Sequence, residues 1–328
     1  MWRQQNAPTP MDESERSEIP LICFTVFTPA AVGASLFALP LGGGPAIAAV
    51  AVLMVTAGML ASIAHLARPL RAPRSLAHLS SSWLSREILT VSVFWALAAL
   101  WLAGELGAAG VLPSVVGGVG MRAAACGFQG AAVAAGVVLL WVIAKAYRVH
   151  GQPAWDGSDT FWELVAGALG SGGAVAAAVA ACQEVVQGGP LCSGSIFGCC
   201  SPLAFCLVSL LAVSASCLIM GFAHRRRHDR VAALAEEEGG PRARAAWGDL
   251  AENSAEPRAY LVFDALAGTC ALVASAVALL FGGGASWNTI IAAMLSAAAV
   301  CELAAQTSIR NRFYSLAQHL RYAVRLRR

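Results

Sequence analysis

Apolar residues along this chain come in long runs, which are separated by shorter polar or Gly-rich connections. A helix needs about 20 mostly apolar residues to cross about 30 Å of hydrocarbon. Runs of that length predict eight membrane-spanning helices, at residues 19–39, 45–66, 87–106, 121–147, 161–182, 202–223, 258–281 and 287–307. We therefore expect an all-α, polytopic membrane protein, with the helices bundled in a single integral membrane domain over residues 1–328 and residues 224–257 as its one sizeable polar loop.

The connections between these runs alternate in charge. One set is Gly-rich and lacks Lys and Arg: residues 40–45, 107–120, 183–201 and 282–286. The other set comprises the N-terminus, residues 67–86, 148–160 and 224–257, and the C-terminal tail. With span ends included, it carries all of the 22 lysines and arginines except Arg122. Because basic connections stay in the cytoplasm, we expect a multi-pass protein of the bacterial cytoplasmic (inner) membrane with both termini cytoplasmic.

Composition agrees with a membrane location. Hydrophobic residues make up 58% of the chain and charged residues 12%, against about 25% charged residues in ordinary soluble domains. The mean hydropathy is +0.65. A chain so poor in charge cannot coat a water-facing surface, so lipid is expected to cover most of it. The net charge of +3 gives no reason to expect a nucleic-acid partner.

Ten cysteines are present, but none forms a CxxC pair. Metal and iron–sulfur sites use Cys or His at short, regular spacing, so no metal site is expected in this chain. Cys192 lies close in sequence to Cys199 and Cys200, and it can pair with either if that loop faces an oxidising compartment.

Ionisable residues within apolar spans are candidates for function by default, because they are costly there. Glu163 and Asp264 fall in the first turns of their spans, where the helix N-terminus favours negative charge. Glu302 lies deeper, with Gln306 one turn further along. A hydrogen-bonded packing role and a functional role both remain open for Glu302.

The most informative stretch connects the second span to the third. His65 ends one apolar run and Glu87 opens the next, so both lie at the same membrane face. Neutral His accepts a proton near physiological pH, and a half-buried carboxylate can do the same. A redox ligand that loses two protons with two electrons needs two such acceptors. The alternative for Glu87 is simple stabilisation by the helix N-terminus behind a Ser85 cap.

The run from His65 to Ile88, HLARPLRAPRSLAHLSSSWLSREI, resembles a signature of the DmsC family, the NrfD-like membrane anchors of dimethyl sulfoxide reductase-type molybdoenzymes. Two further stretches agree with that family. AYRVHGQPAW, at 146–155, resembles its Tyr-to-Pro-x-Trp segment, and the tail with Glu302, Arg310, Phe313 and Tyr314 resembles its C-terminal ending. The residues that fit the first signature are Arg71, Ala72, Leu76, Ser85, Glu87 and Ile88.

The resemblance implies an anchor that oxidises menaquinol to menaquinone in anaerobic respiration, without a haem or iron–sulfur cluster of its own. Its electrons are expected to pass to an iron–sulfur subunit and then to a molybdopterin catalytic subunit, where the terminal substrate is reduced. His65 and Glu87 would take the quinol protons. The expected quinol-binding residues are His65, Arg68, Arg71, Ser85, Arg86 and Glu87.

Two other functions are weighed against this one. A small-molecule transporter or exporter would need charged pairs at mid-membrane and broken helices in corresponding halves, whereas the spans here are almost free of charge. A haem-bearing anchor would need paired histidines within facing helices, and of the six histidines only His65 stands at a span end. Both alternatives are therefore weaker than the quinol-oxidising anchor.

Overall fold

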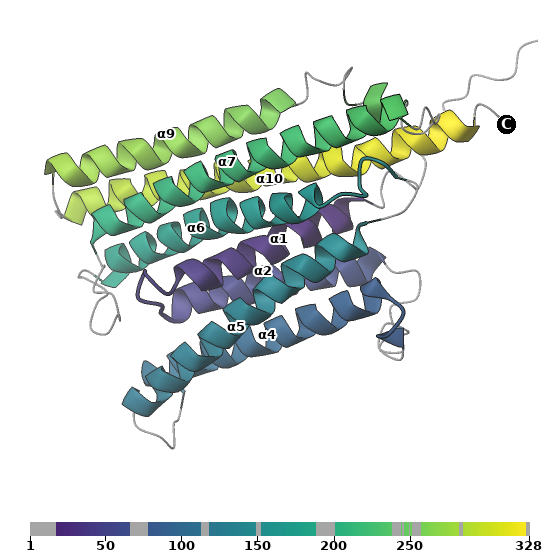
Figure 1. The fold of residues 1–328 in the computed structure, drawn as a ribbon. Helices are drawn as coiled ribbons and strands as arrows, with labels where there is room; N and C mark the ends of the chain where they lie inside the picture. Colours follow the sequence, from purple (N-terminus) through teal and green to yellow (C-terminus); the bar gives the residue numbers. More distant parts are fainter. Residues whose placement is uncertain are drawn as a thin grey trace, which may run out of the picture.

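The computed structural model describes residues 18–65, 78–112, 118–148, 152–187, 201–237, 257–281 and 285–325, together with 244, 246–248 and 250. Long helices dominate these residues, and no strand is found among them (Figure 1). The helices are α1 (Ile19–Phe37), α2 (Pro45–His65), α4 (Trp83–Ala108), α5 (Gly118–Ala146), α6 (Asp159–Gln187), α7 (Pro202–Glu237), α9 (Pro257–Phe281) and α10 (Ala285–Arg325).

Within the described residues, 8 helices are long and apolar enough to cross a membrane. This confirms the predicted all-α, multi-pass architecture. The predicted boundaries hold closely for α1, α2 and α9 and are too short elsewhere. The largest differences are at α7 and α10, which continue to Glu237 and Arg325, well past the predicted ends at 223 and 307. Hydropathy marks where lipid ends, whereas Ala, Arg and Glu are good helix formers that propagate a helix into water.

The bundle consists of two groups of four helices, each contiguous in sequence. The helices α1, α2, α4 and α5 pack mainly among themselves, and so do α6, α7, α9 and α10. The main contact between the groups is α1 against α6, which lie in the middle of the molecule (Figure 1). This central helix pair therefore makes the largest contribution to the packing of the two groups against each other.

The α1–α6 contact depends on glycine. A Cβ atom added at Gly172 of α6 would lie 2.6 Å from the backbone nitrogen of Ala34 in α1, and one added at Gly33 would collide with the carbonyl oxygen of Ala168. Small residues allow such close backbone approach in lipid. The Ala/Gly-rich helix α6 thus packs tightly against α1. In α5, Gly136 likewise packs closely against Val32 of α1, whereas Gly127 and Gly130 face open space.

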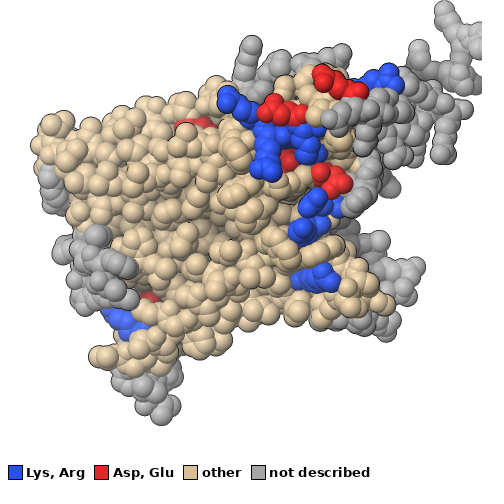
Figure 2. Space-filling model, in the orientation of Figure 1, with Lys and Arg blue, Asp and Glu red and all other residues tan. Residues whose placement is uncertain are grey.

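Charged side chains gather at one end of the bundle, which we call the basic end. Figure 2 shows Lys, Arg, Asp and Glu together there. The described residues that define it are Lys145, Arg148, Arg225, Arg226, Arg227, Arg230 and Arg310. Ile22 and Val26 of α1 pack against Phe313 and Tyr314 of α10 at this end. The start of α1 and the later part of α10 therefore lie on the same side, as an even number of spans requires.

Substitution of Gly172 by Ala should loosen the central helix pair. Overpacking a tight interface typically costs about 1–3 kcal/mol, so Gly172→Ala should lower the melting temperature of the purified protein in detergent by several degrees. The matched control is Gly130→Ala, because a Cβ atom there meets nothing within 4 Å. Equal melting temperatures for the two variants would contradict the close α1–α6 packing.

Candidate functional site

The first turn of α4 is fixed by the short segment before it. The hydroxyl of Ser82, the N-cap residue, accepts a hydrogen bond from the backbone N–H of Ser85 at 3.3 Å. The Arg86 guanidinium donates to the carbonyl oxygens of Leu79 and Ser80, at 2.8 Å each. It also lies over the Trp83 ring, 4.3 Å from its centroid. Arg86 therefore ties the preceding segment to the helix.

These contacts correct the expected start of the third span. The helix begins at Trp83 and is capped by Ser82, so the Ser85 cap of the alternative reading for Glu87 is wrong. The polar residues of the first turn are stabilised by the Ser82 cap and by the Arg86 contacts, which hydropathy does not detect. Glu87 consequently lies in the second turn. Stabilisation by the helix N-terminus falls off within the first turn, so it accounts poorly for a carboxylate at this position.

Glu87 is buried at the basic end. It is 7% exposed, and the neighbouring Ser85 is 2% exposed. No described residue forms an ion pair or hydrogen bond with the Glu87 carboxyl group. That group lies close enough to the phenols of Tyr147 and Tyr314 for their charges to interact. Buried polar groups are rarely left without a partner, so this carboxyl group is the strongest candidate for contact with a ligand.

A pair of tyrosine hydroxyls lies close enough to Glu87 for electrostatic interaction. Tyr314 of α10 donates a hydrogen bond to the hydroxyl oxygen of Tyr147, which follows α5, at 2.8 Å. The hydroxyls of Thr25 and Tyr314 are 3.4 Å apart. Burial raises the pKa of the Tyr147 phenol well above its ordinary value. Tyr147 therefore remains a neutral hydroxyl near neutral pH, able to donate or accept a hydrogen bond without carrying charge.

An aromatic cluster supports the tyrosine pair. The rings of Trp155 and Phe313 are stacked, with centroids 4.9 Å apart and planes 4° from parallel. The Trp155 indole also donates to the Phe313 carbonyl oxygen at 2.8 Å. Tyr147 meets Trp155, Phe313 and Tyr314 edge to face. Tyr147 and Trp155 are thereby packed against Phe313 and Tyr314 of α10, although they are far apart in sequence. Tyr147 and Tyr314 also lie within electrostatic range of Glu87.

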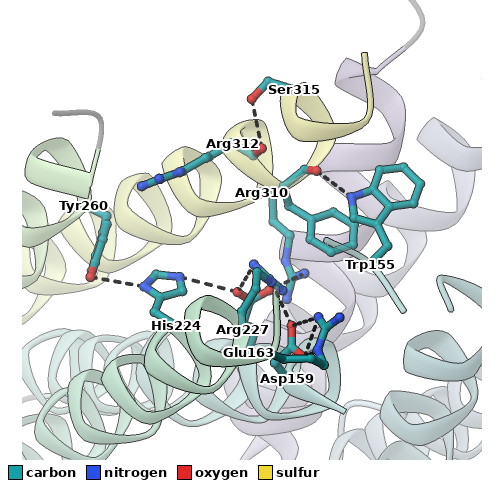
Figure 3. A network of polar contacts seen from close by, with 11 residues as sticks. Trp155, Asp159, Glu163, His224, Arg227, Tyr260, Arg310, Arg312 and Ser315 are labelled. Atoms are coloured by element: carbon teal, nitrogen blue, oxygen red, sulfur yellow. Dashed lines mark hydrogen bonds and ion pairs between the residues drawn. The ribbon is translucent and has the colours of Figure 1, made fainter. Parts of the chain in front are cut away.

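A buried ion-pair network adjoins this cluster (Figure 3). Arg227 of α7 binds Asp159 at 2.7 Å and Glu163 at 2.6 Å, both in the first turns of α6. Arg230 binds Asp159 at 3.0 Å, and Arg310 of α10 lies 3.7 Å from Glu163. Arg227 and Arg310 are 5% and 2% exposed, so these charges are compensated inside the protein. The network joins α6, α7 and α10.

His224 extends the network toward α9. Its Nε2 atom lies 3.4 Å from the Glu163 carboxylate, and its Nδ1 atom lies 3.3 Å from the Tyr260 hydroxyl (Figure 3). Sequence reasoning assigned Glu163 only to the helix N-terminus and did not identify Asp159, Arg227 or Arg230. A signal was available: Asp159 and Glu163 are four residues apart, and Arg227 and Arg230 three, so each pair shares one helix face.

Other expected features fall partly outside the described residues. His65 is the last residue of α2, but its side chain is not described, and Arg68, Arg71, Cys192, Cys199 and Cys200 lie outside the described residues. Helix α2 packs against α4, which brings the His65 backbone and the Glu87 turn to the same end of the bundle. In the part of the chain that the structure describes, no group of three His, Cys, Asp or Glu is placed to hold a metal ion.

Comparison with known proteins identifies the family. The profile of the DMSO reductase anchor subunit (DmsC) matches residues 12–217, more than half of the chain. The chain is 31% identical over 127 residues to the anaerobic dimethyl sulfoxide reductase protein YnfH of Escherichia coli (strain K12), which covers 39% of this chain and 41% of that protein. It is 31% identical over 158 residues to the C subunit of the anaerobic dimethyl sulfoxide reductase of Haemophilus influenzae, which covers 45% of this chain and 53% of that protein.

These alignments span about half the length of the two relatives. The family match includes Glu87 and Tyr147 and ends within α7. The profile match, the eight candidate membrane spans and the buried Glu87 site agree, and the chain belongs to the DmsC family of DMSO reductase anchor subunits.

Proposed function

We propose that this protein is the membrane anchor and quinol-oxidising subunit of a molybdopterin oxidoreductase complex of the DMSO reductase type. In this role it accepts electrons from menaquinol in anaerobic respiration. It passes them to an iron–sulfur subunit, which supplies a molybdopterin catalytic subunit. Family membership supports the anchoring role. The partner subunits and the quinol reaction are proposed in addition to it.

The observation that carries this proposal is the convergence at Glu87. A buried carboxyl group without a described partner lies close enough to two neutral phenols for their charges to interact, and those phenols belong to an aromatic cluster at the end of the bundle. Those residues fit a quinol, which offers hydroxyl groups as hydrogen-bond donors and an apolar ring for aromatic contact. The apolar surface of the helices allows such a ligand to approach from the lipid.

Quinol oxidation releases two electrons and two protons, and the chain supplies groups to receive the protons. His65 ends α2, which packs against α4. Its imidazole hydrogen-bonds one ligand hydroxyl and takes the first proton. The Glu87 carboxylate takes or relays the second. The Tyr147 and Tyr314 hydroxyls orient the ligand by hydrogen bonding and do not themselves ionise, because burial keeps Tyr147 neutral.

The remaining site residues hold the ligand or the partner subunit. Ser85 is buried one residue from Arg86 and two from Glu87, where its hydroxyl helps to orient the ligand. Arg86 fixes the segment before α4 through the Leu79 and Ser80 carbonyls. Arg68 and Arg71, in the same connection, orient the ligand or contact the iron–sulfur subunit by charge.

The orientation follows from the charge distribution. The basic end faces the cytoplasm by the positive-inside rule, and with it the start of α1 and the later part of α10. If the partner subunits are exported, either this orientation is reversed or the basic residues at this end serve docking. The membrane is the bacterial cytoplasmic membrane.

Glu87→Gln should abolish quinol-driven reduction by the assembled complex. General acid–base groups typically contribute about 10²–10⁴-fold to rate, so a loss of that size is expected with the menaquinol analogue as donor. Activity with a soluble dye that reduces the partner subunits directly should be unchanged. Glu105→Gln is the matched control, because Glu105 is 8% exposed at the opposite end of α4 and accepts a bond from Trp101. Undiminished quinol-driven turnover in Glu87→Gln would remove the role of this carboxyl group.

His65→Ala should likewise abolish quinol-driven reduction while the complex still assembles and retains dye-driven activity. The reason is the loss of the first proton acceptor. His78→Ala provides the comparison, because His78 is exposed and belongs to the same connection between α2 and α4. The role of His65 is refuted if both variants turn over quinol at the wild-type rate.

A further inference from the structure

A second pair of buried carboxyl groups lies in the other half of the bundle. Asp264 of α9 and Glu302 of α10 are 6% and 0% exposed. One oxygen of Glu302 accepts hydrogen bonds from the Ser216 hydroxyl and the Gln306 amide, each at 3.1 Å. The Cys217 thiol donates to one oxygen of Asp264 at 3.5 Å. The two carboxyl groups lie close enough for their charges to interact.

Each carboxyl group also has an oxygen without a hydrogen-bond partner among the described residues. These atoms are Oδ1 of Asp264 and Oε2 of Glu302, both inaccessible to solvent. No described Arg, Lys or His lies within ion-pair distance of either group. By contrast, Glu163 on the neighbouring α6 lies within ion-pair distance of Arg227, Arg310 and His224.

Two adjacent carboxylates cannot both remain ionised in such surroundings. Burial disfavours the charged form, and a like charge nearby disfavours it further. Two carboxyl groups in this situation share one proton. A metal ion is a poorer occupant, because no described group of three His, Cys, Asp or Glu is arranged to hold one.

We propose that Asp264 and Glu302 form a proton-binding site that holds one proton between them and carries a net charge of −1. Binding of the proton converts one carboxylate to the acid. The O–H of that acid then donates a hydrogen bond to the carboxylate oxygen of the other residue. The pair lies beyond residues 12–217, in the second group of four helices, whereas Glu87 lies in the first. The pair is therefore a separate site from the one proposed for the quinol.

Polar groups connect this pair to the basic end. On α10, Arg310, Gln306 and Glu302 succeed one another at intervals of one helical turn, on one face. His224 of α7 and Tyr260 of α9 contact each other closer to the basic end. Cys217 of α7 and Asp264 of α9 contact each other about two turns and one turn further from it. The titratable groups along this route are Glu163, Cys217, His224, Arg227, Tyr260, Cys301 and Arg310.

In the other direction the described interior becomes largely apolar, with the hydroxyls of Ser209 and Ser275 as buried polar groups. The buried residues of α9 and α10 beyond the pair include Ala267, Ala274, Leu295 and Ala298, which belong to the main hydrophobic core. A proton on this pair therefore exchanges with the basic end, through His224, and does not cross the bundle.

Infrared difference spectroscopy tests the shared proton. The wild-type protein in lipid nanodiscs should show a protonated carboxyl band at neutral pH. That band should be lost or shifted both in Asp264→Asn and in Glu302→Gln, because one proton belongs to both groups. Glu184→Gln is the control, since Glu184 is buried at the opposite end of α6, and it should leave the band unaltered. A band that either pair variant leaves unaltered would overturn the proposal.

A second measurement needs no substitution within the pair, in case those variants fail to fold. A carbodiimide that reacts with protonated buried carboxyls should label Asp264 or Glu302 in the wild-type protein at neutral pH, as read by peptide mass spectrometry. Absence of label on both residues overturns the shared proton.

The route is tested by hydrogen–deuterium exchange of the infrared band. His224→Leu should slow exchange several-fold relative to wild type, because it removes the group that links the pair to the basic end. His228→Leu is the control, since His228 lies one turn further along α7 and is exposed. An exchange rate unchanged by His224→Leu would contradict access through this residue.

Discussion

Compensation of the fully buried Glu163 carboxylate holds the basic end of this protein together. Burying an ion in a low-dielectric interior costs several kcal/mol unless partners surround it, and Glu163 is within ion-pair distance of Arg227, Arg310 and His224. These partners come from α7 and α10. Arg227 and Arg310 both lie over the ring of Phe313, which stacks on Trp155. The surroundings of Glu87 thus depend on an ion pair formed by other helices.

Glu163, Glu87 and the Asp264–Glu302 pair represent three situations of a buried carboxyl group that sequence alone cannot distinguish. Glu163 is compensated by cations and serves structure. Glu87 is buried within electrostatic range of neutral phenols and has no described hydrogen-bond or ion-pair partner, which suits a ligand that brings its own hydrogen-bond donors. Asp264 and Glu302 interact with each other, and no described cation lies within ion-pair distance of either. Such a pair of carboxyl groups suits a shared proton. The chemistry of each group follows from its neighbours, and most of these neighbours are remote in sequence.

The membrane architecture could be predicted because lipid imposes a minimum apolar length on each helix. The charge asymmetry of the connections also predicted correctly that the start of α1 and the later part of α10 share one end. Hydropathy could not predict that α7 and α10 continue as helices into the polar segments. It also placed the start of α4 too late, because the Ser82 cap and the Arg86 contacts stabilise a polar first turn.

The candidate site was predictable only in part. Glu87 stood out by its position at a span end, and the 147–155 and Phe313–Tyr314 stretches stood out by family resemblance. Their meeting in space, through the Tyr147–Tyr314 hydrogen bond and the Trp155–Phe313 stack, required the structure. The Asp159–Arg227 pair was missed because the two residues lie 68 positions apart in sequence. The sequence does not show that the acidic face of α6 and the basic face of α7 pack against each other.

The central claim is that quinol binds beside Glu87 at the basic end. Photolabelling of the assembled complex with an azido-quinone, followed by peptide mass spectrometry, tests it most directly. The account predicts adducts in the first turns of α4, in residues 147–155 or near Phe313 and Tyr314, and competition by excess menaquinone analogue. Competable adducts confined to the Gly-rich end, around Glu105 and Gln183, would contradict it.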